Sequence, residues 1–325
     1  MSVVSRSAMK VFFKCWDKLW FSRFDPLSVS LFRIFLGILI LVMFLANAPN
    51  WDRFYGAYGI PSLHDLDLNR PSEDSWSLFY WTEGKIPVGA YWWLGFLAAL
   101  AFTIGWKTRW ATILLYALQT SMIHRNLAIV NGDDLVLRML LFYSCFAPLN
   151  HCLSVDWWLK KKRERAEGPV SESEWPLIWP IRMMQINIAF IYLISLPYKL
   201  LGDPGWLNGD EIYWVMASSM WSRWPWPQVF CQWNGLLSKI FTYGTIASEA
   251  CFPTLVWFRP TKLYVLAAIA ALHLGIAFVI PNVAFFTLAM VCSFWVFVPA
   301  SRIREWLGRL RDSFSKKYSM AATLS

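Results

Sequence analysis

Charged residues are scarce in this sequence. Asp, Glu, Lys and Arg make up 16% of its 325 residues, whereas 57% are hydrophobic and 18% are aromatic. An average soluble domain carries about 25% charged residues, so this chain has too little polar surface for a soluble globular protein. Its formal net charge of +9 comes from short basic clusters between apolar runs, which is not the pattern of a nucleic-acid-binding face. The composition predicts an integral membrane protein that partners the lipid bilayer and no nucleic acid.

Common enzyme motifs are also absent from the sequence. The six cysteines form no CxxC pair, and five lie in or beside apolar runs, so we expect small core residues and no disulfide framework. There is no Walker loop, dinucleotide fingerprint, GxSxG elbow or metal-ligand spacing, and the four histidines are scattered. We therefore expect no metal cofactor. Apolar and basic residues alternate near the N-terminus, from which we expect no cleavable signal peptide.

Apolar runs dominate the rest of the chain and predict an all-α fold, a polytopic membrane bundle of about eight transmembrane helices. The runs cover about residues 28–46, 88–106, 110–123, 135–149, 181–198, 237–257, 263–280 and 283–298. Residues 9–24 place Phe and Trp on one helical face and Lys on the other, which predicts an amphipathic helix in the membrane interface. A soluble partner-binding helix is the alternative. Residues 301–311 predict a second, basic amphipathic helix.

The runs divide the chain into an interfacial segment (1–27), a transmembrane domain (28–300) and a basic tail (301–325). With eight spans, both termini and all five basic clusters fall on one side of the membrane. Because Lys and Arg are enriched in cytoplasmic loops, we expect cytoplasmic termini and a multi-pass location in the cell inner (plasma) membrane. The loops at 124–134 and 199–236 would face outward.

Lys199 is the one charged residue at the end of the fifth apolar run, before a turn rich in Gly and Pro. A lysine at this place either extends its ammonium to the membrane interface or acts as a partly desolvated base. Asp133 and Asp134 are predicted at the same outer face. They would form a structural ion pair with Lys199, or tune and orient it in a proton-transfer site.

Glu249 and His273 each lie near the middle of an apolar run. A charged side chain at the centre of a membrane costs roughly 2.5 kcal/mol or more, so such residues usually face the bundle interior. A neutral histidine that is hydrogen-bonded to the backbone or to Glu249 is the plain alternative to a functional role. The outer segment around Trp206 is rich in aromatic residues, which would form either pocket walls or an interfacial belt.

Short words between residues 25 and 300 resemble the bacterial horizontally transferred transmembrane domain (HTTM) family, which is related to the membrane domain of vitamin K-dependent gamma-carboxylase. The words occur in the family's order, and their combination is more specific than any single one. They are Leu31-Phe-Arg-Ile-Phe-Leu-Gly37, His124-Arg-Asn126, Asn131-Gly-Asp-Asp134, Pro148, Ser154-Val-Asp156, Tyr192-Leu-Ile-Ser195, Lys199-Leu200, Trp206, Gly209, Glu249, Pro253 and Leu272-His273.

The resemblance implies roles for particular residues. In the carboxylase, a lysine of the Tyr…Lys-Leu word deprotonates the reduced quinone, and Lys199 occupies that position here. Asp133 stands where the carboxylase has a histidine implicated in carboxylation. The chain also ends soon after the eighth run, without the large extramembrane domain that grips the propeptide. The candidate site residues are catalytic Lys199, Asp133 and Asp134, and cofactor-binding Glu249, His273, Trp206 and Tyr192.

Two functions are open on these grounds. The first is a membrane enzyme, a carboxylase-like or quinol-dependent epoxidase-like lyase, with an outward-facing lysine base. Its cofactor would be a reduced, vitamin K-like quinone or another lipid-soluble compound, and it would modify a small molecule or peptide. The second is a non-enzymatic membrane factor for the maturation, export or immunity of a secreted bacterial peptide. In that case the aromatic outer segment is a docking surface and Lys199 an interfacial anchor.

Overall fold

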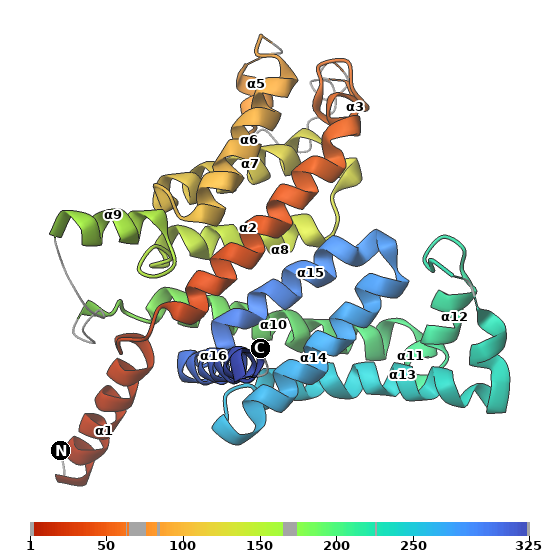
Figure 1. Cartoon of the computed structure of the whole chain (residues 1–325). Helices are drawn as coiled ribbons and strands as arrows, with labels where there is room; N and C mark the ends of the chain where they lie inside the picture. Colours follow the sequence, from red (N-terminus) through yellow and green to blue (C-terminus); the bar gives the residue numbers. More distant parts are fainter. Residues whose placement is uncertain are drawn as a thin grey trace.

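The computed structural model describes residues 3–62, 64, 76–82, 85–164, 174–224 and 226–323. These residues are all-α and contain no β-strand, so the predicted fold class is confirmed at that level. An antiparallel bridge joins Arg23 and Leu177. Figure 1 shows the helices gathered around α2 (Leu27–Asn47), which packs against α6 (Val88–Ile104) and α15 (Ala284–Ser293).

The remaining elements follow in two series. Between α2 and residue 164 lie η1 (Ala48–Asn50), α3 (Trp51–Tyr55), α5 (Leu78–Trp81), α6, α7 (Thr108–Arg125), η2 (Leu127–Ile129), α8 (Gly132–Phe146) and α9 (Val155–Glu164). From residue 179 onward the order is α10 (Trp179–Gly202), α11 (Pro204–Asn208), α12 (Glu211–Ala217), α13 (Pro227–Leu255), α14 (Arg259–Val279), η4 (Pro281–Val283), α15, η5 (Phe294–Phe297) and α16 (Ala300–Thr323).

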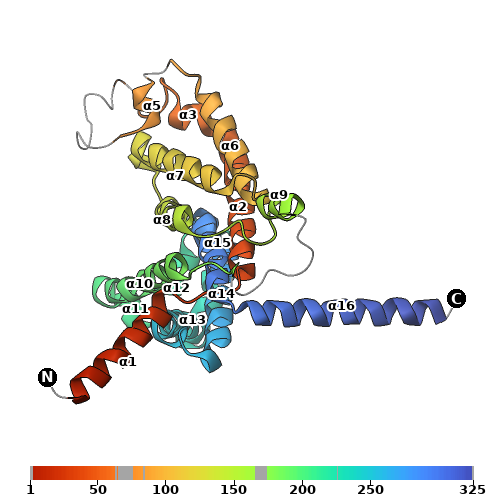
Figure 2. The same cartoon turned by 90° about the vertical axis from the view of Figure 1, so that its left-hand side faces the viewer.

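Helices at both ends of the chain extend from the bundle. Figure 1 shows α1 (Val3–Trp20) projecting from one end, and Figure 2 shows α16 leaving as a single long helix. On α1, Phe12, Phe13 and Trp16 are exposed on one face, and Lys14 lies on the other. The predicted N-terminal amphipathic helix is therefore present, although it begins before residue 9 and ends at Trp20.

Local sequence explains where the helices next to the site begin and end. Asn131 and Asp134 form a capping box at the start of α8, which satisfies otherwise unpaired backbone amides. Asp203 accepts a hydrogen bond from the amide of Gly205 and so starts α11. Gly209 ends α11 in the left-handed conformation, with φ of 81°, which glycine adopts without steric cost.

The number of membrane-spanning helices differs from the prediction. Among the described residues, three helical segments are long and apolar enough to cross a membrane: Leu27–Tyr55, Trp179–Gly202 and Arg259–Val279. A pair bent by 96°, Pro281–Phe297 with Ala300–Arg309, is a fourth if it counts as one span. The sequence predicted about eight.

The other predicted runs are helices, but they fall short in length or apolarity. α6, α8 and α15 have 17, 15 and 10 residues, whereas a simple crossing needs about 20. α7 and α13 are longer but contain polar side chains such as Gln119 and Glu249. The basic segment that begins at Lys160 also differs from the predicted loop, because it continues α9 as far as Glu164.

Apolar side chains cover part of the outer surface of the bundle. On α2, Phe35, Ile38, Val42 and Leu45 are exposed and recur at helical spacing, opposite buried residues such as Ile40. An exposed apolar stripe on a helix marks contact with lipid or with another protein. This surface is compatible with insertion into a membrane.

Candidate functional site

Helix α10 presents three polar side chains on one face near its C-terminal end. Tyr192, Ser195 and Lys199 follow one another at spacings of three and four residues, which places them in line along a helix. α13 contributes Glu249 and α14 contributes His273 opposite this face. Three helices therefore build one polar cluster inside the bundle.

Lys199 and Glu249 form a close ion pair. The Lys199 Nζ atom lies 2.5 Å from each carboxylate oxygen of Glu249, and the two side chains are 23% and 8% exposed. Ser195 Oγ lies 3.2 Å from Glu249 Oε2 and 3.1 Å from the carbonyl oxygen of Tyr192. Because water reaches this pair poorly, each charge depends on the other for its stabilisation.

The side of Lys199 that faces the end of the bundle meets an aromatic ring and an acidic pair. Its ammonium lies 4.7 Å from the ring centroid of Trp206 on α11, within the range of cation–π attraction. Glu211 lies nearby. Burial and the neighbouring Asp203 raise the pKa of the Glu211 carboxyl, and Lys199 opposes that rise. The amine thus lies between the carboxyl groups at this end of the bundle and the apolar interior.

His273 is held by Tyr192. The Tyr192 hydroxyl and His273 Nε2 lie 2.7 Å apart, and the imidazole packs against the rings of Phe286 and Phe294. His273 is 4% exposed, and its Nδ1 atom is buried without a hydrogen-bond partner in the described part of the chain. His273 is therefore hydrogen-bonded to Tyr192. The alternative drawn from the sequence had named the backbone or Glu249 as its partner.

Five of the predicted site residues thus meet in this cluster: Lys199, Glu249, His273, Trp206 and Tyr192. Sequence reasoning missed Ser195 as a member. Its spacing from Tyr192 and Lys199 was a usable signal, since all three share one helical face.

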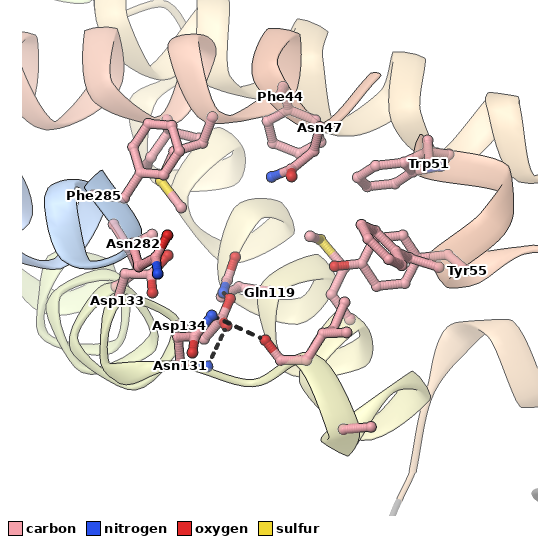
Figure 3. A pocket seen from close by; sticks show the side chains of 17 residues that line it. Phe44, Asn47, Trp51, Tyr55, Gln119, Asn131, Asp133, Asp134, Asn282 and Phe285 are labelled. Atoms are coloured by element: carbon pink, nitrogen blue, oxygen red, sulfur yellow. Dashed lines mark hydrogen bonds between the residues drawn. The ribbon is translucent and has the colours of Figure 1, made fainter. Parts of the chain in front are cut away.

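Asp133 and Asp134 lie elsewhere, so their predicted pairing with Lys199 is not what the structure has. They stand at the N-terminal end of α8, outside the predicted span at 135–149, and line a separate cavity of about 410 Å³ (Figure 3). The physical reason is the capping box, because Asp134 accepts hydrogen bonds from Gln119 Nε2 and the amide of Asn131. Those bonds hold it over its own helix end.

The cavity changes the acidity of both aspartates. Burial, and then the charge of Asp134, raise the pKa of Asp133 to about 6. Burial also raises the pKa of Asp134, while its bonds to Asn131 and Gln119 work in the opposite direction. The cavity therefore holds two acidic side chains whose charges are poorly compensated by the protein.

The Phe286 ring lies between the start of α8 and His273. A Cβ atom added to Gly132 would lie 3.1 Å from the Phe286 ring, and the same ring is 6.1 Å from the imidazole of His273, centroid to centroid. The start of α8 and the lysine cluster are therefore close together, although Phe286 is not among the residues that line the cavity.

No metal centre is found in the described residues, where no group of three or more His, Cys, Asp or Glu side chains is arranged to hold an ion. Comparisons with protein-family models, with curated proteins and with solved structures find no match for this chain. The chemistry of the site is therefore argued from its geometry.

Proposed function

We propose that this protein is a multi-pass membrane enzyme that uses Lys199 as a base, the function that its resemblance to the HTTM family implies. The observation that carries the proposal is the contact between Lys199 and the buried Glu249. Ionisable groups inside a helical membrane bundle are costly, and they commonly mark functional sites.

The pair can store and release a proton. In a poorly hydrated site the charged pair loses much of its advantage over the neutral pair. A proton can then pass from Lys199 Nζ to Glu249, which leaves a neutral amine beside a neutral carboxyl group. The amine takes a proton from an acidic hydroxyl group of the substrate and becomes ammonium again. Its positive charge then stabilises the resulting oxyanion.

The residues present fit a reduced quinone, which would supply such a hydroxyl group on a flat aromatic ring. His273 offers a buried nitrogen that lacks a partner among the described residues. The rings of Phe286, Phe294 and Trp206 provide aromatic walls close to the cluster. These features support quinol binding from the lipid phase without assigning the cofactor's orientation.

The proposal includes the membrane arrangement expected from the sequence, with about eight crossings, cytoplasmic termini and an outward-facing site in the inner membrane. Figure 1 supports it: α9, the connection of α13 to α14 and the start of α16 lie toward one side, and α3 and α12 toward the other. The first group contains the Lys160 cluster, Arg259 and Arg302, as the positive-inside rule requires.

A turnover assay tests the proposal. We expect the full-length protein in lipid nanodiscs to speed the consumption of 2-methyl-1,4-naphthoquinol in air, followed by the absorbance of the oxidised ring. Lys199→Ala should lower the rate at least about a hundredfold, because it removes the base. Lys18→Ala is the matched control, since Lys18 is exposed on α1. Equal rates for wild type and Lys199→Ala would rule the enzyme out.

The non-enzymatic alternative also has an observation in its favour. Trp214, Met220 and Trp226 are 62%, 71% and 56% exposed, so the outer segment presents aromatic and apolar surface suitable for docking a secreted peptide. If Trp214→Ala with Trp226→Ala abolishes the maturation of such a peptide while Lys199→Ala does not, the docking function replaces the enzyme.

A further inference from the structure

We propose that the cavity at the start of α8 binds a small organic molecule that carries a primary ammonium group on an apolar or aromatic body. This inference is independent of the chemistry of Lys199, because Lys199 does not line the cavity. Three features of the cavity point to this class of ligand. They are the negative charge of its lining, its oxygen acceptors that lack a partner, and its aromatic wall.

The lining of the cavity is negative. Among the described residues that line it, two are Asp and none is Lys, Arg or His. Arg125 lies behind Tyr55, but its guanidinium donates to the carbonyl oxygens of three residues between 55 and 61. Nothing in the lining neutralises the two carboxylates, so a cation is favoured and an anion is repelled.

Asp133 supplies the free carboxylate. Asp134 already accepts bonds from Gln119 and Asn131, whereas the hydrogen bond of Asp133 is to its own backbone amide. Figure 3 shows Asp133 at the wall of the cavity beside Asn282. Its remaining oxygen lone pairs are available to an ammonium group, which donates up to three hydrogen bonds.

Tyr55 supplies a second acceptor. Its side chain is 7% exposed and its hydroxyl, which Figure 3 shows directed into the cavity, has no hydrogen-bond partner among the described residues. A hydroxyl that faces a cavity without a hydrogen-bond partner from the protein favours a ligand that supplies one. An N–H group of a ligand held in the cavity would provide that partner.

Aromatic rings form the opposite wall of the cavity. The Trp51 ring lies 5.6 Å from that of Phe44 and 4.6 Å from that of Tyr55, centroid to centroid. The indole N–H of Trp51 donates to the carbonyl of Val88, so the indole presents no free N–H donor to the cavity. Such a wall suits a cation and the apolar body attached to it. A volume of about 410 Å³ accommodates one small organic molecule.

Calorimetric titration of the full-length protein in nanodiscs tests the inference, with 2-phenylethylammonium chloride as the probe. We expect one molecule to bind per chain. Phenylacetate, which has the same ring and the opposite charge, should bind at least about tenfold more weakly. Sodium chloride at the same ionic strength measures inorganic cation binding.

Variants identify the site. Asp133→Asn keeps the shape of the side chain and should weaken phenylethylammonium binding at least about tenfold, since it removes the charge partner. Tyr55→Phe should weaken it severalfold, because it removes only the hydroxyl. Asp17→Asn removes the same charge from an exposed position on α1 and should bind like wild type.

The pH dependence provides a second readout. Affinity should fall as the pH is lowered through about 6, where Asp133 takes up a proton. The other ionisable groups at this wall are Asp134, whose pKa is also raised, Tyr55, and Arg125 behind it. Asp133→Asn should flatten the profile. Equal binding of phenylacetate, unchanged binding by Asp133→Asn, or a response to sodium ions alone would each overturn the inference.

Discussion

At the scale of single residues, the observation that matters most for function is which carboxylate pairs with Lys199. Three carboxylates on two different helices were available by sequence, and the folded chain pairs Lys199 with Glu249. Glu249 is the more deeply buried member of the pair. A buried ion pair of this kind contributes little net stability. Removal of one partner is nevertheless destabilising, because it leaves the other charge buried without compensation.

Substitution of Glu249 tests that description. We expect Glu249→Ala to lower the free energy of unfolding by about 3 kcal/mol, because the Lys199 ammonium is left without its partner. The double variant Lys199→Met with Glu249→Leu should lie close to wild type. Unfolding of the purified protein by denaturant in detergent measures both. A double variant as unstable as the single one would show that the pair stabilises the fold by itself.

At the scale of helices, close approach depends on small residues at the contacts. α2 and α6 meet at Gly37, where an added Cβ would lie 2.3 Å from Thr103 Oγ1 and 3.0 Å from its Cα. Small residues allow such approach in membrane bundles, where packing replaces the hydrophobic effect between helices. Gly244 on α13 has nothing within 4 Å of its added Cβ.

This pair of glycines makes a matched prediction. Gly37→Ala should destabilise the protein by about 1–3 kcal/mol, because the added methyl group forces α2 and α6 apart. Gly244→Ala should be neutral or stabilise by up to about 1 kcal/mol, as alanine is the better helix former. The denaturant concentrations at the unfolding midpoint of both variants test this difference. Equal shifts in the two midpoints would show that close packing of α2 on α6 at Gly37 does not contribute to stability.

At the scale of the whole molecule, one end of the bundle is strongly basic. A cavity of about 1200 Å³ opens there, and its only acidic residue among those described is Asp25, which pairs with Arg304. The ionisable and cationic residues along it are Asp25, His151, Lys161, Arg182, Arg259, Lys262, Arg302 and Arg304. Clusters of this kind attract the phosphate groups of anionic lipids.

Lipid composition should therefore alter stability. We expect a higher melting temperature in phosphatidylglycerol nanodiscs than in phosphatidylcholine nanodiscs, by several degrees, with the difference shrinking at high salt. Arg259→Gln with Lys262→Gln should reduce the difference. Arg311→Gln, which removes an exposed charge outside the cavity, should leave it unchanged. The same melting temperature in both lipids would argue against lipid contact at this end.

Much of the local structure could be predicted because it depends on neighbouring residues. Each apolar run became a helix, since hydrophobic periodicity is a local signal. Asn131 and Gly209 marked a helix start and a helix end through capping and a left-handed turn. Among the described residues, three segments, or four with the bent pair, are long and apolar enough for a simple span, fewer than the eight predicted runs. The reason is that α6, α8 and α15 are short and that α7 and α13 contain polar residues.

The sequence alone therefore determined the all-α class, the amphipathic ends and the presence of ionisable groups inside apolar helices. Only the tertiary structure decided which of these groups meet. Glu249 on α13 meets Lys199 on the neighbouring α10, while Asp133 and Asp134 line a cavity with residues of α2, α3 and α7. The reason is that charge pairing and cavity formation depend on how distant helices pack, and spacing along one helix cannot encode that contact.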